Sequence, residues 1–193
     1  LMPPFMGQGM CAGIRDASNL AWKIIKCLEN YHDEKLLNTY QSERFSNVKE
    51  YIETTMRMGE FVNAVESIQI TDNITSSTDG IKSMKSIKPR LGKGLGQKSD
   101  KHRGKIFPQF KQKNGKNLDE KFSKSPLLIV SSNIKKKISK KTNYIKSLNV
   151  IGLTKYLEDI NSYAIIVRPD RFIFQSCNKV KNLDKLVNLF NKF

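Results

Sequence analysis

The segment from Met2 to Lys23 reads MPPFMGQGMCAGIRDASNLAWK and is the most informative part of this 193-residue chain. Its proline pair, Pro3-Pro4, cannot continue a helix, and Gly7 and Gly9 permit a left-handed backbone or the close approach of a ligand. From Met10 onward, apolar residues recur every three to four positions, which is the spacing of a helix. The segment is therefore predicted to be a rigid loop that leads directly into a helix N-terminus.

The predicted helix start has the properties of a binding site for an anion or a polarised carbonyl. Such an end carries N–H donors without intrahelical partners and about half a positive charge. The small residues Gly9, Cys11 and Gly13 leave room for a flat ligand against the backbone. On the residues alone, an ordinary connecting loop is the alternative, because Pro- and Gly-rich loops before helices commonly do no more than turn the chain.

Residues 2–23 resemble the second flavin motif of the group A aromatic-ring hydroxylases, single-component FAD monooxygenases of the p-hydroxybenzoate hydroxylase type. The family's next helix carries a Leu-x-x-Tyr-x-x-Glu-Arg pattern, which is matched here by Leu37, Tyr40, Glu43 and Arg44. In that family Gly-Asp-Ala-Ala-His directly precedes the residues that open this chain. No Gly-x-Gly-x-x-Gly follows a strand here. The resemblance therefore implies the C-terminal part of a longer enzyme, truncated at its N-terminus and inactive alone.

The resemblance implies an oxidoreductase that hydroxylates a small phenolic substrate, with FAD as cofactor and NADPH or NADH as co-substrate. It assigns the contacts with the isoalloxazine ring to one loop and helix start, namely Pro4, Gly7, Gln8, Gly9, Met10 and Cys11. The backbone amides of Met10 and Cys11 would stabilise the negative charge of the reduced ring. No catalytic side chain is implied. The alternative is a non-catalytic remnant that serves as an interaction or dimerisation module.

The rest of the chain predicts an α/β fold in three parts. Residues 1–61 are expected to form the end of an FAD-binding domain, with a second helix capped by Asp33, and residues 62–103 a linker. Residues 104–193 alternate short apolar runs with helical patterns. Within them the expected elements are strands at Ile106–Phe110, Leu127–Val130, Val150-Ile151, Tyr163–Val167 and Phe172–Phe174, a helix over about 154–160, and a last helix from about Asn182.

The predicted hairpin across Arg168–Arg171 and the last helix support a thioredoxin-like C-terminal domain, which weaker echoes of the family also imply. Its polar turn residues, Arg168, Asp170 and Arg171, are interpreted as hairpin-turn polars. Cys177 has no cysteine nearby, so thiol chemistry is not expected of this domain.

The net charge of +16 is confined to one stretch: residues 81–146 carry twenty Lys and Arg against three Asp and Glu. Because only Phe107 and Phe110 interleave with these charges, a solvated lysine surface is favoured over a specific nucleic-acid site. The cysteines are three and widely spaced, and the histidines two, which argues against a disulfide scaffold and a structural metal site and favours the cytoplasm. No apolar run is long enough to span a membrane. A homodimer is left open.

Overall fold

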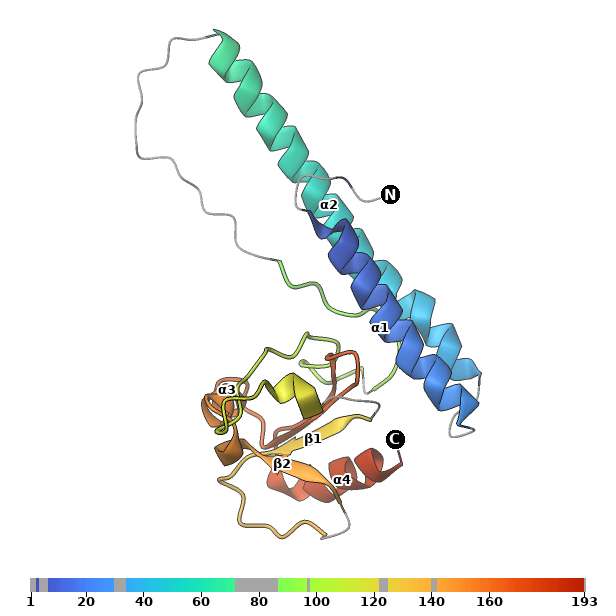
Figure 1. Ribbon diagram of the computed structural model, residues 1–193, viewed down its shortest axis with the longest axis vertical. Helices are drawn as coiled ribbons and strands as arrows, with labels where there is room; N and C mark the ends of the chain where they lie inside the picture. Colours follow the sequence, from blue (N-terminus) through green and yellow to red (C-terminus); the bar gives the residue numbers. More distant parts are fainter. Residues whose placement is uncertain are drawn as a thin grey trace.

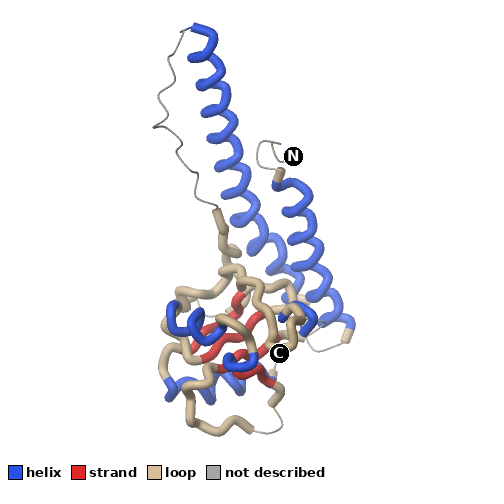
Figure 2. Tube along the Cα trace, turned by 60° about the vertical axis from the view of Figure 1, so that its left-hand side comes forward, coloured by secondary structure: helices blue, strands red, loops and turns tan. Residues whose placement is uncertain are grey.

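The structure is a computed structural model that describes residues 3, 7–29, 34–71, 87–96, 98–121, 125–139 and 142–192. It has two parts in contact, a pair of long helices and an α/β unit built on a four-stranded sheet. Figure 1 shows the α/β unit beside one half of the helical pair, while the far end of α2 extends beyond α1. The same arrangement is visible from a second direction in Figure 2.

The helical pair consists of α1 (Gln8–Leu28) and α2 (Lys35–Thr71). Helix α1 begins two residues earlier than predicted, because Gly7 adopts a left-handed backbone (φ 59°) that turns the chain directly into the helix. Trp22 of this helix is buried, with 4% of its surface exposed. Helix α2 runs ten residues beyond its predicted end at residue 61. Asp33, the predicted N-cap of α2, lies outside the described residues.

The sheet has the order β2-β1-β3-β4, with β1 and β2 parallel and the other neighbours antiparallel. The bounds are β1 (Leu127–Val130), β2 (Tyr144–Lys146), β3 (Ala164–Val167) and β4 (Ile173–Cys177). The predicted β3–β4 hairpin is confirmed. Strand β2 was not expected from its sequence, whereas the expected strands at Ile106–Phe110 and Val150-Ile151 form only isolated bridges.

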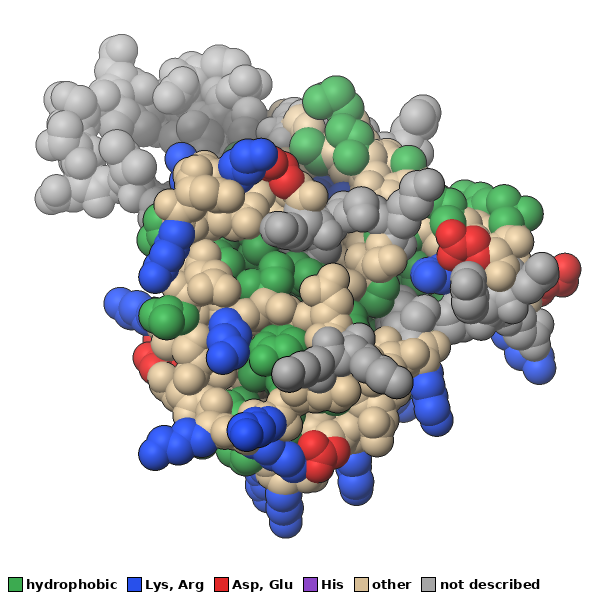
Figure 3. Space-filling view, turned by 60° about the horizontal axis from the view of Figure 1, so that its bottom comes forward, with side chains coloured by type: hydrophobic (Ala, Val, Ile, Leu, Met, Phe, Trp, Pro, Cys, Tyr) green, Lys and Arg blue, Asp and Glu red, His purple; other side chains and the backbone are tan. Residues whose placement is uncertain are grey.

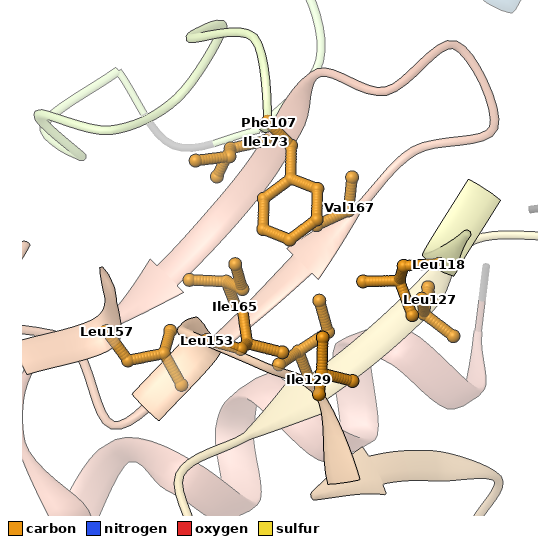
Figure 4. Close-up of a cluster of buried hydrophobic side chains, with 10 residues drawn as sticks. Phe107, Leu118, Leu127, Ile129, Leu153, Leu157, Ile165, Val167 and Ile173 are labelled. Atoms are coloured by element: carbon orange, nitrogen blue, oxygen red, sulfur yellow. The ribbon is translucent and has the colours of Figure 1, made fainter. Parts of the chain in front are cut away.

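Helices cover both faces of the sheet. They are α3 (Leu153–Asp159) and α4 (Leu183–Asn191), with 3₁₀ turns at η2 (Leu118–Lys121), η3 (Ser147–Asn149) and η4 (Val180–Asn182). One face packs with α3 in the cluster shown in Figure 4, where Ile129, Ile165 and Leu153 meet. The other face packs against α4 through Leu183 and Leu186. Strands β1 and β3 are buried on both faces, which explains their unbroken apolar sequence.

The described residues between 87 and 105, which include part of the predicted linker and the first residues after it, pack on both parts of the molecule. The amide of Gly104 donates to the carbonyl of Ile173 (2.8 Å), and the Ile173 amide donates to the carbonyl of Lys105 (2.9 Å). The Asp100 carboxylate accepts bonds from the amide and hydroxyl of Ser176. These contacts cover the free edge of β4. On the other side of the segment, the Gly92 amide bonds the Glu43 carbonyl of α2 (2.8 Å).

Candidate functional site

The start of α1 keeps open space around its glycines. A Cβ added at Gly9 or Gly13 would meet no atom of the described chain within 4 Å. Met10 is 75% exposed on the same turn of helix. Internal packing therefore supplies no reason for a glycine at position 9 or 13, and a flat ligand could lie against this backbone. Pro4, the predicted neighbour of the ring face, lies outside the described residues.

The early start of α1 changes which amides are available to a ligand. In an α-helix, the carbonyl of the N-cap residue accepts the first intrahelical bond, here from Cys11 to Gly7. The amides of Gly9 and Met10 belong to the first turn, whose donors have no partner inside the helix. Of the expected pair, the Met10 amide therefore lies in this first turn together with the Gly9 amide, whereas the Cys11 amide does not.

Arg15 ties the beginning of α1 to α2. Its guanidinium carbon lies 5.1 Å from the centre of the Tyr51 ring, within cation–π range. Its Nη1 also reaches the side-chain oxygen of Gln8 at 3.5 Å. Arg15 therefore links the first turn of α1, at Gln8, to Tyr51 of α2.

A second constellation, a buried charge cluster, lies farther along α1. It comprises Asn19 and Lys23 of α1, Glu43 of α2, and Arg168 and Asp170 of the β3–β4 turn. Asn19, Lys23 and Glu43 have no exposed surface, and Arg168 is 2% exposed. Helices and hairpin that are far apart in sequence thus meet through charged side chains.

The Glu43 carboxylate is the centre of this cluster. Its Oε1 accepts from Arg168 Nη1 (2.8 Å) and from the amide of Leu95 (3.0 Å). Its Oε2 accepts from Arg168 Nη2 (2.9 Å), Lys23 Nζ (2.9 Å) and Asn19 Nδ2 (3.2 Å). Although burial alone would raise the pKa of this carboxyl, Arg168 and Lys23 together hold the Glu43 pKa well below its usual value, at about 2.

Arg168 faces two carboxylates at once. Its Nε and Nη2 also donate to Asp170, at 3.0 and 2.6 Å, and its guanidinium carbon lies 5.0 Å from the Trp22 ring centre. Burial opposes the charged form, but the two carboxylates dominate and raise the Arg168 pKa further. Burial lowers the pKa of Lys23 in spite of Glu43.

Arg168 and Asp170 do lie in the hairpin turn, but their side chains are buried and bond Glu43 and Asn19 of the helices. Arg171 does lie in the exposed part of the turn and bonds Gln109 (3.0 Å) and Asp119. The sequence places Arg168 directly after a fully apolar strand, but nothing in it indicates a partner 125 positions away.

The second charged residue of the Leu-x-x-Tyr-x-x-Glu-Arg pattern joins the same two helices. Arg44 Nε donates to Asp16 of α1 (2.6 Å), and its Nη1 donates to Asn47 (2.6 Å). Asn47 in turn donates to the carbonyl of Pro89 (2.7 Å). The pattern therefore organises α1, α2 and the segment that follows the helices.

The described residues also line cavities away from the start of α1. One of about 440 Å³ lies between β4 and α4 and is lined by Asp100, His102 and Lys185, among others. Another, of about 470 Å³, lies along α2 beside Phe45 and Ile52. Within the described ranges no group of His, Cys, Asp and Glu could hold a metal ion. A search of the same residues for a long, apolar, membrane-crossing helix also finds none.

Cys177 is buried, its thiol donates to the carbonyl of Lys179 (3.0 Å), and burial raises its pKa. A raised pKa disfavours the thiolate. This agrees with the expectation that the α/β unit performs no thiol chemistry.

Comparison with known sequences identifies the N-terminal part. Residues 1–55 match the family described as FAD binding domain. A probable NADH-specific resorcinol 4-hydroxylase of Rhodococcus jostii is 50% identical over 58 residues, which are 30% of this chain and 11% of that protein. A 3-(3-hydroxy-phenyl)propionate/3-hydroxycinnamic acid hydroxylase of Escherichia coli is 41% identical over 59 residues, 31% of this chain and 11% of the relative. The matched segment thus spans about a tenth of the length of these curated relatives.

Comparison with solved structures extends the likeness of fold to the whole chain. A complex of aklavinone-11 hydroxylase with FAD and aklavinone superposes with a TM-score of 0.66 at 14% identity, covering 100% of this chain and 41% of that one. RebC-10x gives 0.64 at 16% identity, covering 99% and 43%. The α/β class is confirmed by the mixed sheet and its helices. The chain is accordingly similar to part of the flavin-dependent aromatic hydroxylases, and its residues 1–55 match the family described as FAD binding domain.

Proposed function

We propose that this chain is the part of an FAD-dependent aromatic-ring monooxygenase that presents the start of α1 to the edge of the isoalloxazine ring. The observation that carries the proposal is the geometry at that start. Gly7 turns the chain into the helix, and Gly9 and Gly13 face open space. FAD supplies the redox chemistry of such enzymes, and the protein supplies binding and orientation.

The residues of this chain have a limited role in that proposal. The amides of Gly9 and Met10 would donate to the pyrimidine edge, and the positive end of α1 would favour negative charge there by about 0.3–1 kcal/mol. Gln8 and Cys11 would line the ring beside them, with Pro4 at its face. The names of the relatives support a phenolic substrate and a nicotinamide co-substrate, of which NADH is printed for one of them.

The arrangement of the α/β unit is also part of the proposal. A thioredoxin-like unit is supported by a mixed sheet with α3 and α4 on opposite faces. The buried Cys177 leaves it a structural role. A cytoplasmic location and a homodimer remain predictions.

The proposal is tested by replacing, in the Rhodococcus jostii relative, the segment that matches residues 1–55 with residues 1–55 of this chain. The chimera should retain FAD, because the segment would supply equivalent backbone donors. Gly9→Val in the chimera should lower flavin content severely, since a branched side chain would occupy the open space. Cys11→Ser should leave flavin content nearly unchanged, because the backbone survives the change.

Ser18→Val, an exposed position on the same helix, is the matched control for an added branched side chain. A Gly9→Val chimera with normal flavin content and normal hydroxylation would remove this loop from the flavin site. The isolated chain should bind FAD weakly, because a few hydrogen bonds of about 0.5–1.5 kcal/mol each do not offset the cost of ordering so large a ligand.

A further inference from the structure

The buried charge cluster joins three segments that are distant in the sequence. Arg168 makes two-pronged contacts with Glu43 of α2 and with Asp170 of its own turn. From α1, Asn19 Nδ2 donates to both carboxylates, at 3.2 Å to Glu43 and 2.8 Å to Asp170. The helical pair and the α/β unit are thus joined by hydrogen bonds between buried side chains of both parts.

We propose that Arg168 and Asp170 are positioning residues that clamp α1 and α2 to the α/β unit, so that the hairpin holds the helix whose first turn meets the flavin. The consequence for the flavin rests on the proposed function, whereas the clamp itself does not. The α/β unit then acts on the ring indirectly, by fixing the axis of α1, and contributes no residue to the loop.

The charge balance of the cluster supports a clamp. Two cations, Lys23 and Arg168, are buried with two anions, Glu43 and Asp170. Loss of one member leaves an uncompensated buried charge, which is far more destabilising than loss of an exposed pair. Separation of the hairpin from the helices would break both Arg168–Glu43 bonds and the Asn19–Asp170 bond.

The packing around the cluster points the same way. The Trp22 ring lies 5.0 Å from the Arg168 guanidinium carbon and 5.9 Å from Lys23 Nζ. Since Trp22 is the single tryptophan of the chain, its fluorescence reports on the surroundings of this one ring. The amide of Leu95 completes the Glu43 coordination from the segment that links the two parts.

Arg171 provides a matched control in the same turn. Its side chain is 40% exposed, and its partners Asp119 and Gln109 both belong to the α/β unit. Arg171→Met removes the same charge from the same hairpin without touching the helices. If the arginines served only the turn, the two substitutions would act alike.

The experiment measures hydrogen exchange and Trp22 emission in the 193-residue chain and its variants, without FAD. In Arg168→Met, the amides of residues 12–19 in α1 should exchange at least about tenfold faster, while those of β1 should change by less than about threefold. The Trp22 emission should shift as well. Arg171→Met should leave both observables as in the unsubstituted chain.

A conservative variant separates positioning from general destabilisation. Arg168→Lys keeps the charge but not the two-pronged contacts, so it should restore part of the α1 protection. If Arg168→Met does not fold, the double variant Glu43→Gln with Arg168→Met replaces it, because it leaves the neutral pair Lys23 and Asp170. In this double variant, exchange should still be accelerated more for the α1 amides than for the β1 amides, each relative to the unsubstituted chain.

Equal acceleration in α1 and β1, or no acceleration in α1, would overturn the clamp. That result would leave the flavin proposal standing, because the Gly9 chimeras test it separately. A clamp that is observed in variants of this chain, together with a Gly9→Val chimera of normal flavin content, would refute only the flavin proposal.

Discussion

Glu43 shows how a single carboxylate can hold distant parts of a fold. Its position in the Leu-x-x-Tyr-x-x-Glu-Arg pattern is visible in the sequence, but its partners are not. In the structure it is fully buried and accepts bonds from Lys23, Arg168 and Leu95. The neighbouring Arg44 bonds Asp16 and so fastens the same helices independently. Adjacent residues of one motif thus make separate contacts.

The pKa of Glu43 predicts how stability depends on pH. Its pKa in the folded chain, about 2, lies below the ordinary value of 4.5. The ionised Glu43 therefore stabilises the fold fully at a pH above 4.5, and this stabilisation is lost as the pH falls toward 2. At about 1.4 kcal/mol per pKa unit, the free energy of unfolding should fall by about 3 kcal/mol at most. Urea unfolding across this window measures the fall, and Glu43→Gln should lack that part of it. An unchanged pH slope in the variant would contradict the assignment.

The glycines of α1 predict stability changes of opposite sign. Gly13→Ala should stabilise the chain by about 0.5–1 kcal/mol, because the position is helical and a Cβ meets nothing within 4 Å. Gly7→Ala should destabilise it by about 1–2 kcal/mol, because φ is +59°. Gly9→Ala should also be stabilising, yet should lower flavin content in the chimera. Thermal unfolding gives the three values, and a stabilising Gly7→Ala would contradict the left-handed cap.

Among the elements, the segment 87–96 is packed more tightly than a linker. Gly92 and Gly94 lie directly against α2, where Cβ atoms would overlap Ser42 and Glu43 respectively. Leu91 beside them is 4% exposed. The segment thus serves as a spacer between α2 and the edge of the sheet. The sequence predicted a linker here, whereas in the structure the glycines permit close approach to α2.

Gly94→Ala is expected to destabilise the chain by about 1–3 kcal/mol, because the new methyl would collide with the buried Glu43 side chain. Lys93→Ala, at the exposed position between the two glycines, should change stability by less than about 0.5 kcal/mol. Chemical denaturation of both variants measures the difference. Equal stabilities would show that the segment does not press on α2.

At the scale of the whole molecule, positive charge is spread over exposed lysines of the α/β unit, including the face drawn in Figure 3. Figure 3 shows Lys and Arg side chains projecting separately from this face. The run Lys135–Lys137 is exposed, and Lys136 contacts Asp184 of α4. Residues 81–146 are not only surface, however, since they supply β1 and buried side chains such as Phe107 and Leu118.

Binding to DNA or RNA is therefore expected to be non-specific and to weaken steeply with salt, because phosphate neutralisation by scattered lysines depends on counterion release. Fluorescence anisotropy with one defined and one randomised oligonucleotide, over a range of salt concentrations, checks this. The two curves should coincide. Sub-micromolar binding of the defined sequence alone, at about twice the salt of an ordinary assay, would contradict the expectation.

The sequence alone determined the features that depend on neighbouring residues. The periodicity of α1 and of α4, the unbroken apolar runs of β1 and β3, and the hairpin between β3 and β4 follow from local spacing and turn chemistry. The resemblance carried by residues 2–23 located the flavin motif, and the match of residues 1–55 supports it.

Only the tertiary structure showed which partners the charged residues have and where the segments without a clear sequence pattern lie. The burial of Arg168 depends on Glu43, which lies 125 positions away. Strand β2 is short and only half-buried, so its own sequence does not predict a strand. It forms because it pairs with β1 in parallel. The left-handed Gly7 moved the first turn of α1, and with it the available amides. A buried charge and an edge strand are each stabilised by groups that the chain brings near only after folding, whereas the start of α1 depends on the local backbone conformation of Gly7.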